Sequence, residues 1–246
     1  MSNWKTQARD AQGRFLSKVE VAVPTPVVKK RVSKKAKETV IPQQFNVFLI
    51  DDSTSIRHNG MVDSIRFGFS EIVSSIEEVA NDGKINMSWG ISFFGEPGSS
   101  NYLLTKKAPN LDNYKPRQGS TALYDGIVNI INNTKIYLKS VENANVVLNI
   151  FTDGYENSSR KNSLISTNKA IKEAKNAGWM INFIGGGSEK FVKQTAQDLG
   201  IFAANTVSYQ TNSEDTKAVL SKVSAGMSSY SRSVKKGEAT NDGFFM

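Results

Sequence analysis

The sequence predicts an α/β protein with a doubly wound, mostly parallel central sheet and helices on both of its faces. Short apolar runs that indicate strands alternate with longer segments whose apolar residues recur at helical spacing. Several strand runs are apolar throughout, as in strands buried on both faces of a parallel sheet. With 246 residues, the chain is long enough for one such domain. We expect its core to include Phe48, Ile50, Val147 and Ile150, on adjacent central strands.

The first half of the folded body is predicted to hold three strands and two helices. Apolar side chains three or four positions apart indicate the helices, because this spacing lines one helical face. Runs rich in apolar and β-branched or aromatic residues, separated by polar loops, indicate the strands. We expect strands at 45–50, 85–95 and 101–105, and helices at 60–79 and 122–138.

The second half continues the alternation and ends in a long helix. The first of its strands, NVVLNIFTDG, is a buried apolar run that ends in Asp153 and Gly154. Gly178 follows a periodic segment and predicts the C-terminal end of that helix. We expect strands at 145–154, 179–187 and 202–210, and helices at 163–177, 189–199 and 214–229.

The composition limits the classes of protein that remain possible. Cysteine is absent, which excludes a disulfide framework, a thiolate metal site and cysteine catalysis. No apolar run approaches the roughly 20 residues of a membrane-spanning helix. The first residues lack the apolar core of a signal peptide. We therefore expect a cytoplasmic protein, or alternatively a virion protein, without a membrane partner.

The net charge of +8 is concentrated in the first 40 residues, which hold ten Lys or Arg against three Asp or Glu. These residues carry +7 of the total and show no long helical or strand period. We therefore expect a basic, disordered arm at 1–40, one folded domain at 41–232, and a flexible polar tail at 233–246. A polyanion such as nucleic acid would bind the densest cationic run of the arm, namely Lys29, Lys30, Arg31, Lys34, Lys35 and Lys37.

Carboxylates and hydroxyls follow the strands at the edge where a doubly wound sheet binds ligands. Asp51, Ser53 and Ser55 follow the first predicted strand. Thr121 lies just before the second long helix, and Asp153 ends the fourth strand. Because the carboxyl ends of parallel strands share one edge, we expect these side chains to converge. Two carboxylates and three hydroxyls, without nitrogen or sulfur, suit a hard divalent cation, Mg²⁺ or Mn²⁺.

Three motifs resemble those of the von Willebrand factor A (VWA) domains. DDSTS at 51–55 resembles their D-x-S-x-S motif, GSTALYDGI at 119–127 resembles their second metal loop, and FTDG at 151–154 resembles their third. The order and spacing of the motifs agree over residues 45 to about 230. The resemblance implies a Rossmann-like VWA fold with a metal-ion-dependent adhesion site (MIDAS).

The resemblance also implies a role for each residue. Ser53, Ser55 and Thr121 would bind the metal directly. Asp51 and Asp153 would act largely through water or as acceptors behind the direct ligands. The sixth position would go to an acidic side chain of a protein partner.

Catalytic patterns are incomplete or absent in the sequence. A haloacid-dehalogenase-type phosphatase needs a second Asp two positions after the first, where Ser53 stands here. The G-x-S-x-G elbow of serine hydrolases is absent. A metal-assisted hydrolase needs a base beside a bound water, for which His58 or a spare carboxylate is available. We predict a binding module that is not an enzyme, with a metal-assisted hydrolase as the remaining enzymatic alternative.

Two kinds of binding module fit the sequence. One is an intracellular scaffold or adaptor whose MIDAS grips an acidic residue of a protein partner. Bacterial VWA domains often serve in this way with AAA+ ATPases, chelatases or stress-response systems. The other is a phage virion or nucleoprotein component whose basic arm contacts nucleic acid. No motif in the sequence separates these alternatives.

Overall fold

The computed structural model describes residues 40–97, 102–117, 119–141 and 143–246. The compact body that follows the arm spans Val40–Met246. Nucleic-acid binding by the arm stays a prediction, because its cationic run lies outside the described residues: Lys29, Lys30, Arg31, Lys34, Lys35 and Lys37.

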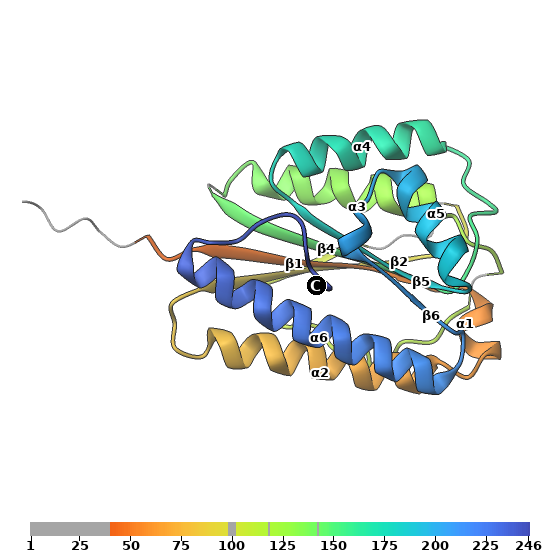
Figure 1. Ribbon diagram of the computed structural model, residues 1–246, viewed down its shortest axis with the longest axis horizontal. Helices are drawn as coiled ribbons and strands as arrows, with labels where there is room; N and C mark the ends of the chain where they lie inside the picture. Colours follow the sequence, from red (N-terminus) through yellow and green to blue (C-terminus); the bar gives the residue numbers. More distant parts are fainter. Residues whose placement is uncertain (1–39, 98–101, 118, 142) are drawn as a thin grey trace, which may run out of the picture. The chain divides into compact units, whose positions relative to one another are not determined.

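Six strands of the described body form one sheet in the order β3-β2-β1-β4-β5-β6. Neighbouring strands are parallel, except that β3 pairs antiparallel with β2 at one edge of the sheet. This arrangement confirms the predicted mostly parallel sheet (Figure 1). The strands are β1 (Gln43–Asp51), β2 (Asn86–Phe94), β3 (Tyr102–Thr105), β4 (Ala144–Thr152), β5 (Met180–Gly186) and β6 (Thr206–Tyr209).

Long helices cover both faces of the sheet, as predicted (Figure 1). One face is covered by α2 and α6, which lie side by side, and the other by α3, α4 and α5. Within the described residues, no helix combines the length and the apolarity that crossing a bilayer requires. These helices are α2 (Val62–Ala80), α3 (Leu123–Leu138), α4 (Leu164–Asn176), α5 (Glu189–Leu199) and α6 (Ser213–Lys236).

Local sequence signals explain where several helices begin and end. Ser163 caps α4 by accepting the N–H of Ser166, and Asn212 caps α6 by accepting that of Asp215. The residue after α5 is Gly200, with a left-handed φ of 78° that glycine adopts without steric cost. The two N-caps therefore fix where α4 and α6 begin, and Gly200 fixes where α5 ends.

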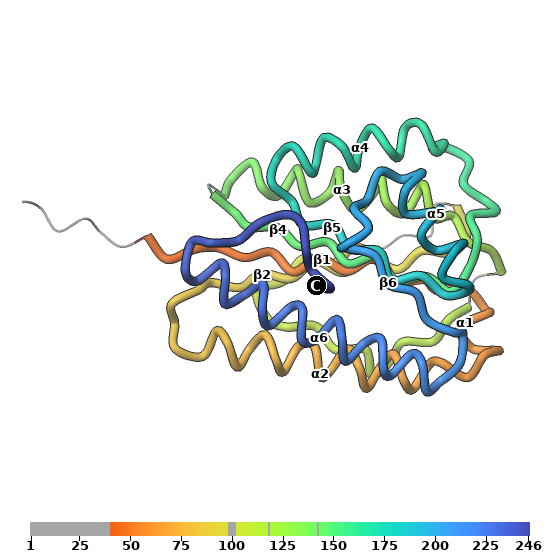
Figure 2. Tube along the Cα trace, viewed as in Figure 1, coloured from red at the N-terminus to blue at the C-terminus, as the bar shows by residue number. Residues whose placement is uncertain are grey.

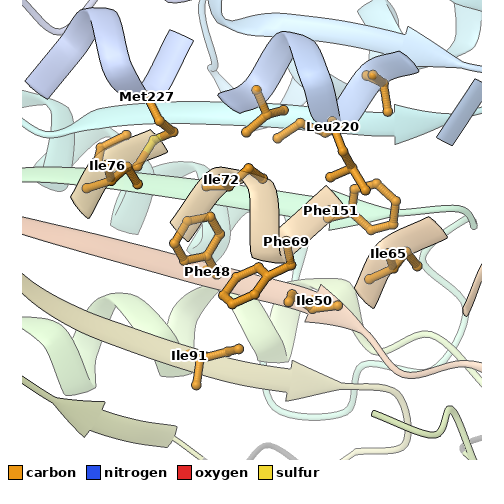
Figure 3. Close-up of a cluster of buried hydrophobic side chains, with 14 of the residues drawn as sticks. Phe48, Ile50, Ile65, Phe69, Ile72, Ile76, Ile91, Phe151, Leu220 and Met227 are labelled. Carbon is orange, nitrogen blue, oxygen red and sulfur yellow. The ribbon is translucent and has the colours of Figure 1, made fainter. Parts of the chain in front are cut away.

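The core has two layers, because alternate strand residues point to opposite faces of the sheet. Phe48, Ile50 and Val147 pack in the layer beneath α2 and α6, where Phe69 meets the ring of Phe48 edge-on (Figure 3). Ile150 lies in the layer covered by α3, α4 and α5. The structure confirms that the four strand residues predicted for the core are buried.

Three segments differ from the predicted elements. Residues 54–58 form a helix, α1 (Thr54–His58), that is too short to show a helical period. The segment at 202–210 begins with a 3-10 turn, η1 (Ala203–Asn205), before β6. Helix α6 continues to Lys236, so the domain boundary expected at residue 233 falls inside it. Buried Tyr230 and Val234 extend its apolar face over these last turns.

The residues after α6 return to the body (Figure 2). Phe244 is 7% exposed and belongs to the core layer of α2 and α6. Its ring lies against Gly226, where an added Cβ would come within 2.5 Å of a ring carbon. The N–H of Phe244 donates to the side-chain oxygen of Asn205, and the amide of Asn205 donates to the carbonyl of Asn241. A buried asparagine thus satisfies the backbone of the last segment.

Truncation of Ile150 tests its place in the core. Ile150 is 0% exposed, so Ile150→Ala should lower the free energy of unfolding by about 2–5 kcal/mol through lost contacts and a cavity. Ile165→Ala is the matched control, because Ile165 is 83% exposed and its truncation should change that energy by less than about 0.5 kcal/mol. Equilibrium denaturant unfolding measures both values. Equal losses in the two variants would contradict the central position of β4.

Candidate metal centre

Two neighbouring strands bring the two aspartates of the predicted site to one edge of the sheet. β1 and β4 are parallel neighbours in the middle of the sheet, and their register places Ile50 opposite Phe151. The segments that follow these residues therefore leave the sheet side by side at its carboxyl edge. Asp51 is the last residue of β1, and Asp153 directly follows β4.

Ser53, Ser55 and Asp153 meet in a cluster of oxygen atoms. The hydroxyl oxygens of the two serines are 2.8 Å apart, and Ser55 donates to Oδ1 of Asp153 at 2.8 Å. The Ser53 hydroxyl lies 3.4 Å from the same carboxylate oxygen. The Thr121 hydroxyl adjoins the cluster from a neighbouring loop, 3.3 Å from the point where a Cβ on Gly154 would lie. Ser53, Ser55 and Asp153 are therefore in direct contact, and Thr121 lies beside Gly154, the residue that follows Asp153.

Asp51 is fully buried and orients the first of these loops. Its Oδ1 accepts the N–H of Ser53 at 2.8 Å, and its Oδ2 accepts the hydroxyl of Thr152 at 2.6 Å. Its backbone carbonyl accepts the hydroxyl of Tyr114. The carboxylate therefore fixes the start of the Ser53–Ser55 turn and ties it to the end of β4.

Burial makes the charged forms of the two site carboxyl groups less favourable. Burial raises the pKa of Asp51 to about 6, although hydrogen bonds from Ser53 and Thr152 oppose this rise. Burial also raises the pKa of Asp153, against hydrogen bonds from neighbouring side chains. A cation at the cluster would favour the charged forms of both carboxyl groups.

The spacing and chemistry of the oxygens fit a divalent cation. Neighbouring ligands of octahedral Mg²⁺ lie about 3 Å apart, because the metal–oxygen distances are about 2.1 Å. The hydroxyl oxygens of Ser53 and Ser55, 2.8 Å apart, are close to this value, and Asp153 Oδ1 lies 2.8 and 3.4 Å from them. No three Asp, Glu or His side chains of the described body gather as a metal site, so a cation here would depend on hydroxyls as well as carboxylates.

Other polar residues near the motifs have separate roles. Asp125 braces a loop: its carboxylate accepts the backbone N–H groups of residues 160–162 at 2.8–3.3 Å. Asp52 is half-buried, and burial raises its pKa to about 6, while the charge of Arg117 lowers it. His58, the candidate base of a hydrolase, is exposed at the end of α1.

Several side chains that support the site were not predicted from the sequence. Thr152 could have been found, because it lies within the FTDG motif. Asn59 donates to Oδ2 of Asp153 at 3.5 Å, and Asn157 accepts the N–H of Thr121 at 2.8 Å. These asparagines and Tyr114 lie outside the regular strands and long helices. A periodic sequence pattern therefore could not predict their hydrogen bonds to the site.

Solved structures share the fold at low sequence identity. The VWA domain of SpRpn10 aligns with 73% of this chain and 94% of its own length, at 17% identity and a TM-score of 0.51. The pilus adhesin SpaC from Lactobacillus rhamnosus GG aligns with 78% of this chain, at 14% identity and a TM-score of 0.59. Proximal thread matrix protein 1 of the mussel byssus, with a zinc-occupied MIDAS motif, aligns with 75%, at 15% identity and a TM-score of 0.51.

Two of the three similar proteins are matched over less than half of their own length. This chain spans 31% of the adhesin and 45% of the thread matrix protein. No family model matches the sequence, and no curated protein matches it. The comparisons show that the described body has the VWA fold that the motifs predicted.

The raised pKa of Asp51 predicts a pH-dependent metal affinity. The metal-free folded protein keeps the Asp51 proton up to about pH 6, whereas an unfolded chain loses it near pH 3.8. As the pH rises through this window, stability of the metal-free fold is lost. Below about pH 6, a cation that binds beside Asp51 would favour release of its proton, which lowers the metal affinity there. The rise in Tm caused by Mg²⁺ should be larger at about pH 7.5 than at about pH 5. Asp51→Asn should reduce the difference between the Tm rises at the two pH values. Equal Tm rises at both pH values in the unmodified chain would contradict a link between metal binding and the Asp51 proton.

Proposed function

We propose that this chain is a binding module that holds a divalent cation, Mg²⁺ or Mn²⁺, and through it an acidic side chain of a protein partner. Ser53, Ser55 and Thr121 would bind the cation directly, and Asp51 and Asp153 would orient and balance this set. The observation that carries the proposal is the oxygen cluster: the Ser53 and Ser55 hydroxyl oxygens are 2.8 Å apart, as neighbouring ligands of an octahedral shell would be, and the Asp153 carboxylate lies 2.8 and 3.4 Å from them.

The donor set favours a cation that binds a further carboxylate. A bound divalent cation would supply positive charge and a ligand position for the partner. Neutral hydroxyl ligands add no negative charge to it, so it keeps its attraction for an outside acid. Exposed cations on the surrounding segments would attract an acidic partner as well, namely Arg57, Arg117, Arg160 and Lys161.

The similar structures support binding in preference to catalysis. One of them carries zinc in its MIDAS motif, and another is a pilus adhesin. Those properties belong to those proteins, and we extend to this chain the metal site and the binding role. The candidate base, His58, is exposed on α1, whereas Ser53 and Thr121 are buried. An adaptor and a virion component would both use a site of this kind.

Loss of one hydroxyl tests the metal site. At a concentration 100 times Kd, Mg²⁺ should stabilise the folded chain by about 2.7 kcal/mol, visible as a higher Tm. Thr121→Ala should remove most of this rise, because it deletes a proposed ligand. Thr54→Ala is the matched control: Thr54 is the variable residue between the two serines and should leave the rise unchanged. A full rise in Thr121→Ala would exclude Thr121 as a ligand.

Metal-dependent retention tests the binding role. Proteins retained by the immobilised full chain in Mg²⁺ should be released by EDTA. Thr121→Ala should fail to retain them, whereas Thr54→Ala should retain them. Replacement of one Asp or Glu of a retained partner by Asn or Gln should abolish its binding, because the amide cannot supply a charged ligand. Binding that survives both EDTA and Thr121→Ala would show that the partner uses another surface.

A further inference from the structure

Helix α3 begins without a cap of its own, directly after a proposed metal ligand. Its N-cap residue is Ala122, which has no side-chain acceptor for the free N–H groups of the first turn. Thr121 immediately precedes this residue. A poorly held first turn would leave the Thr121 hydroxyl without a fixed position.

The loop after β4 supplies the missing acceptors. The N–H of Tyr124 donates to Oε2 of Glu156 at 2.9 Å, and the N–H of Asp125 donates to the Ser159 hydroxyl at 3.0 Å. In return, the Asp125 carboxylate accepts three N–H groups of residues 160–162. Loop and helix therefore hold each other, and the loop acts as a cap from a distant part of the chain.

Within this loop, Asn157 makes a reciprocal pair of hydrogen bonds with Thr121. The N–H of Thr121 donates to Oδ1 of Asn157 at 2.8 Å, and the N–H of Asn157 donates to the carbonyl of Thr121 at 3.0 Å. One residue, 36 positions later in the chain, thus satisfies both backbone groups of Thr121. The Thr121 hydroxyl meanwhile packs against Gly154, next to Asp153.

We propose that Asn157 is a positioning residue of the metal centre, holding the Thr121 backbone so that its hydroxyl faces the cation together with Asp153. This inference rests on the proposed function. Groups that orient a metal ligand typically change metal affinity 10–100-fold, roughly, when they are removed.

Three variants of the full chain test this role. Asn157→Ala removes the acceptor and should raise the Kd for Mg²⁺, measured by calorimetry, by about 10-fold or more. Asn157→Asp restores an acceptor oxygen and should bring the Kd back to within a few-fold of the unmodified value. Asn162→Ala is the matched control. Asn162 lies in the same loop as Asn157, but its side chain donates to Asp125 of α3 and not to Thr121. Its Kd should not change.

The metal-free Tm separates positioning from general stability. We expect Asn157→Ala and Asn162→Ala to have similar Tm values without metal. Only Asn157→Ala should lose affinity for Mg²⁺. An unchanged Kd in Asn157→Ala, or equal losses of affinity in both variants, would overturn the positioning role and leave the metal site standing. Failure of the unmodified chain to bind either Mg²⁺ or Mn²⁺ would overturn the proposed function, and this inference with it.

Discussion

The candidate site depends on one buried carboxylate at the end of a central strand. Asp51 is closed off from water, and both of its oxygens accept hydrogen bonds, from the N–H of Ser53 and the hydroxyl of Thr152. Its backbone carbonyl accepts the hydroxyl of Tyr114 as well. A single residue therefore connects β1, the turn after it, the end of β4 and the loop before α3. Burying this charge is unfavourable, and the hydrogen bonds to both carboxylate oxygens offset only part of that cost.

The sheet makes this arrangement possible. Parallel neighbours deliver Asp51 and Asp153 to the same edge, and the two core layers hold β1 and β4 from both faces. Space at the edge is tight: a Cβ on Gly186, at the end of β5, would come within 2.8 Å of the Asp153 backbone. Glycine is required there because the loop of Asp153 passes directly over the neighbouring strand. The core thus determines where the chain leaves the sheet at Asp51 and Asp153, and the loops determine which side chains contact one another.

The loop of residues 154–162 links stability with the chemistry of the site. Its side chains supply the acceptors that the first turn of α3 lacks, and Asp125 of α3 in turn holds the backbone of the loop. A helix usually finds its cap in the residue before its first turn. Here the cap comes from the loop that directly follows Asp153, so the start of the helix is tied to the segment of the proposed metal site.

The sequence by itself determined the order of strands and long helices along the chain and the mostly parallel sheet, and it indicated the five residues of the candidate site. It could do so because periodicity is local and because the motif residues directly follow or precede regular elements. Only the tertiary structure decided which loops meet. The bonds of Asn157 to Thr121, and the packing of Phe244 against Gly226, join residues far apart in the chain. No local pattern encodes such contacts, because they arise from strand order, register and the packing of the layers.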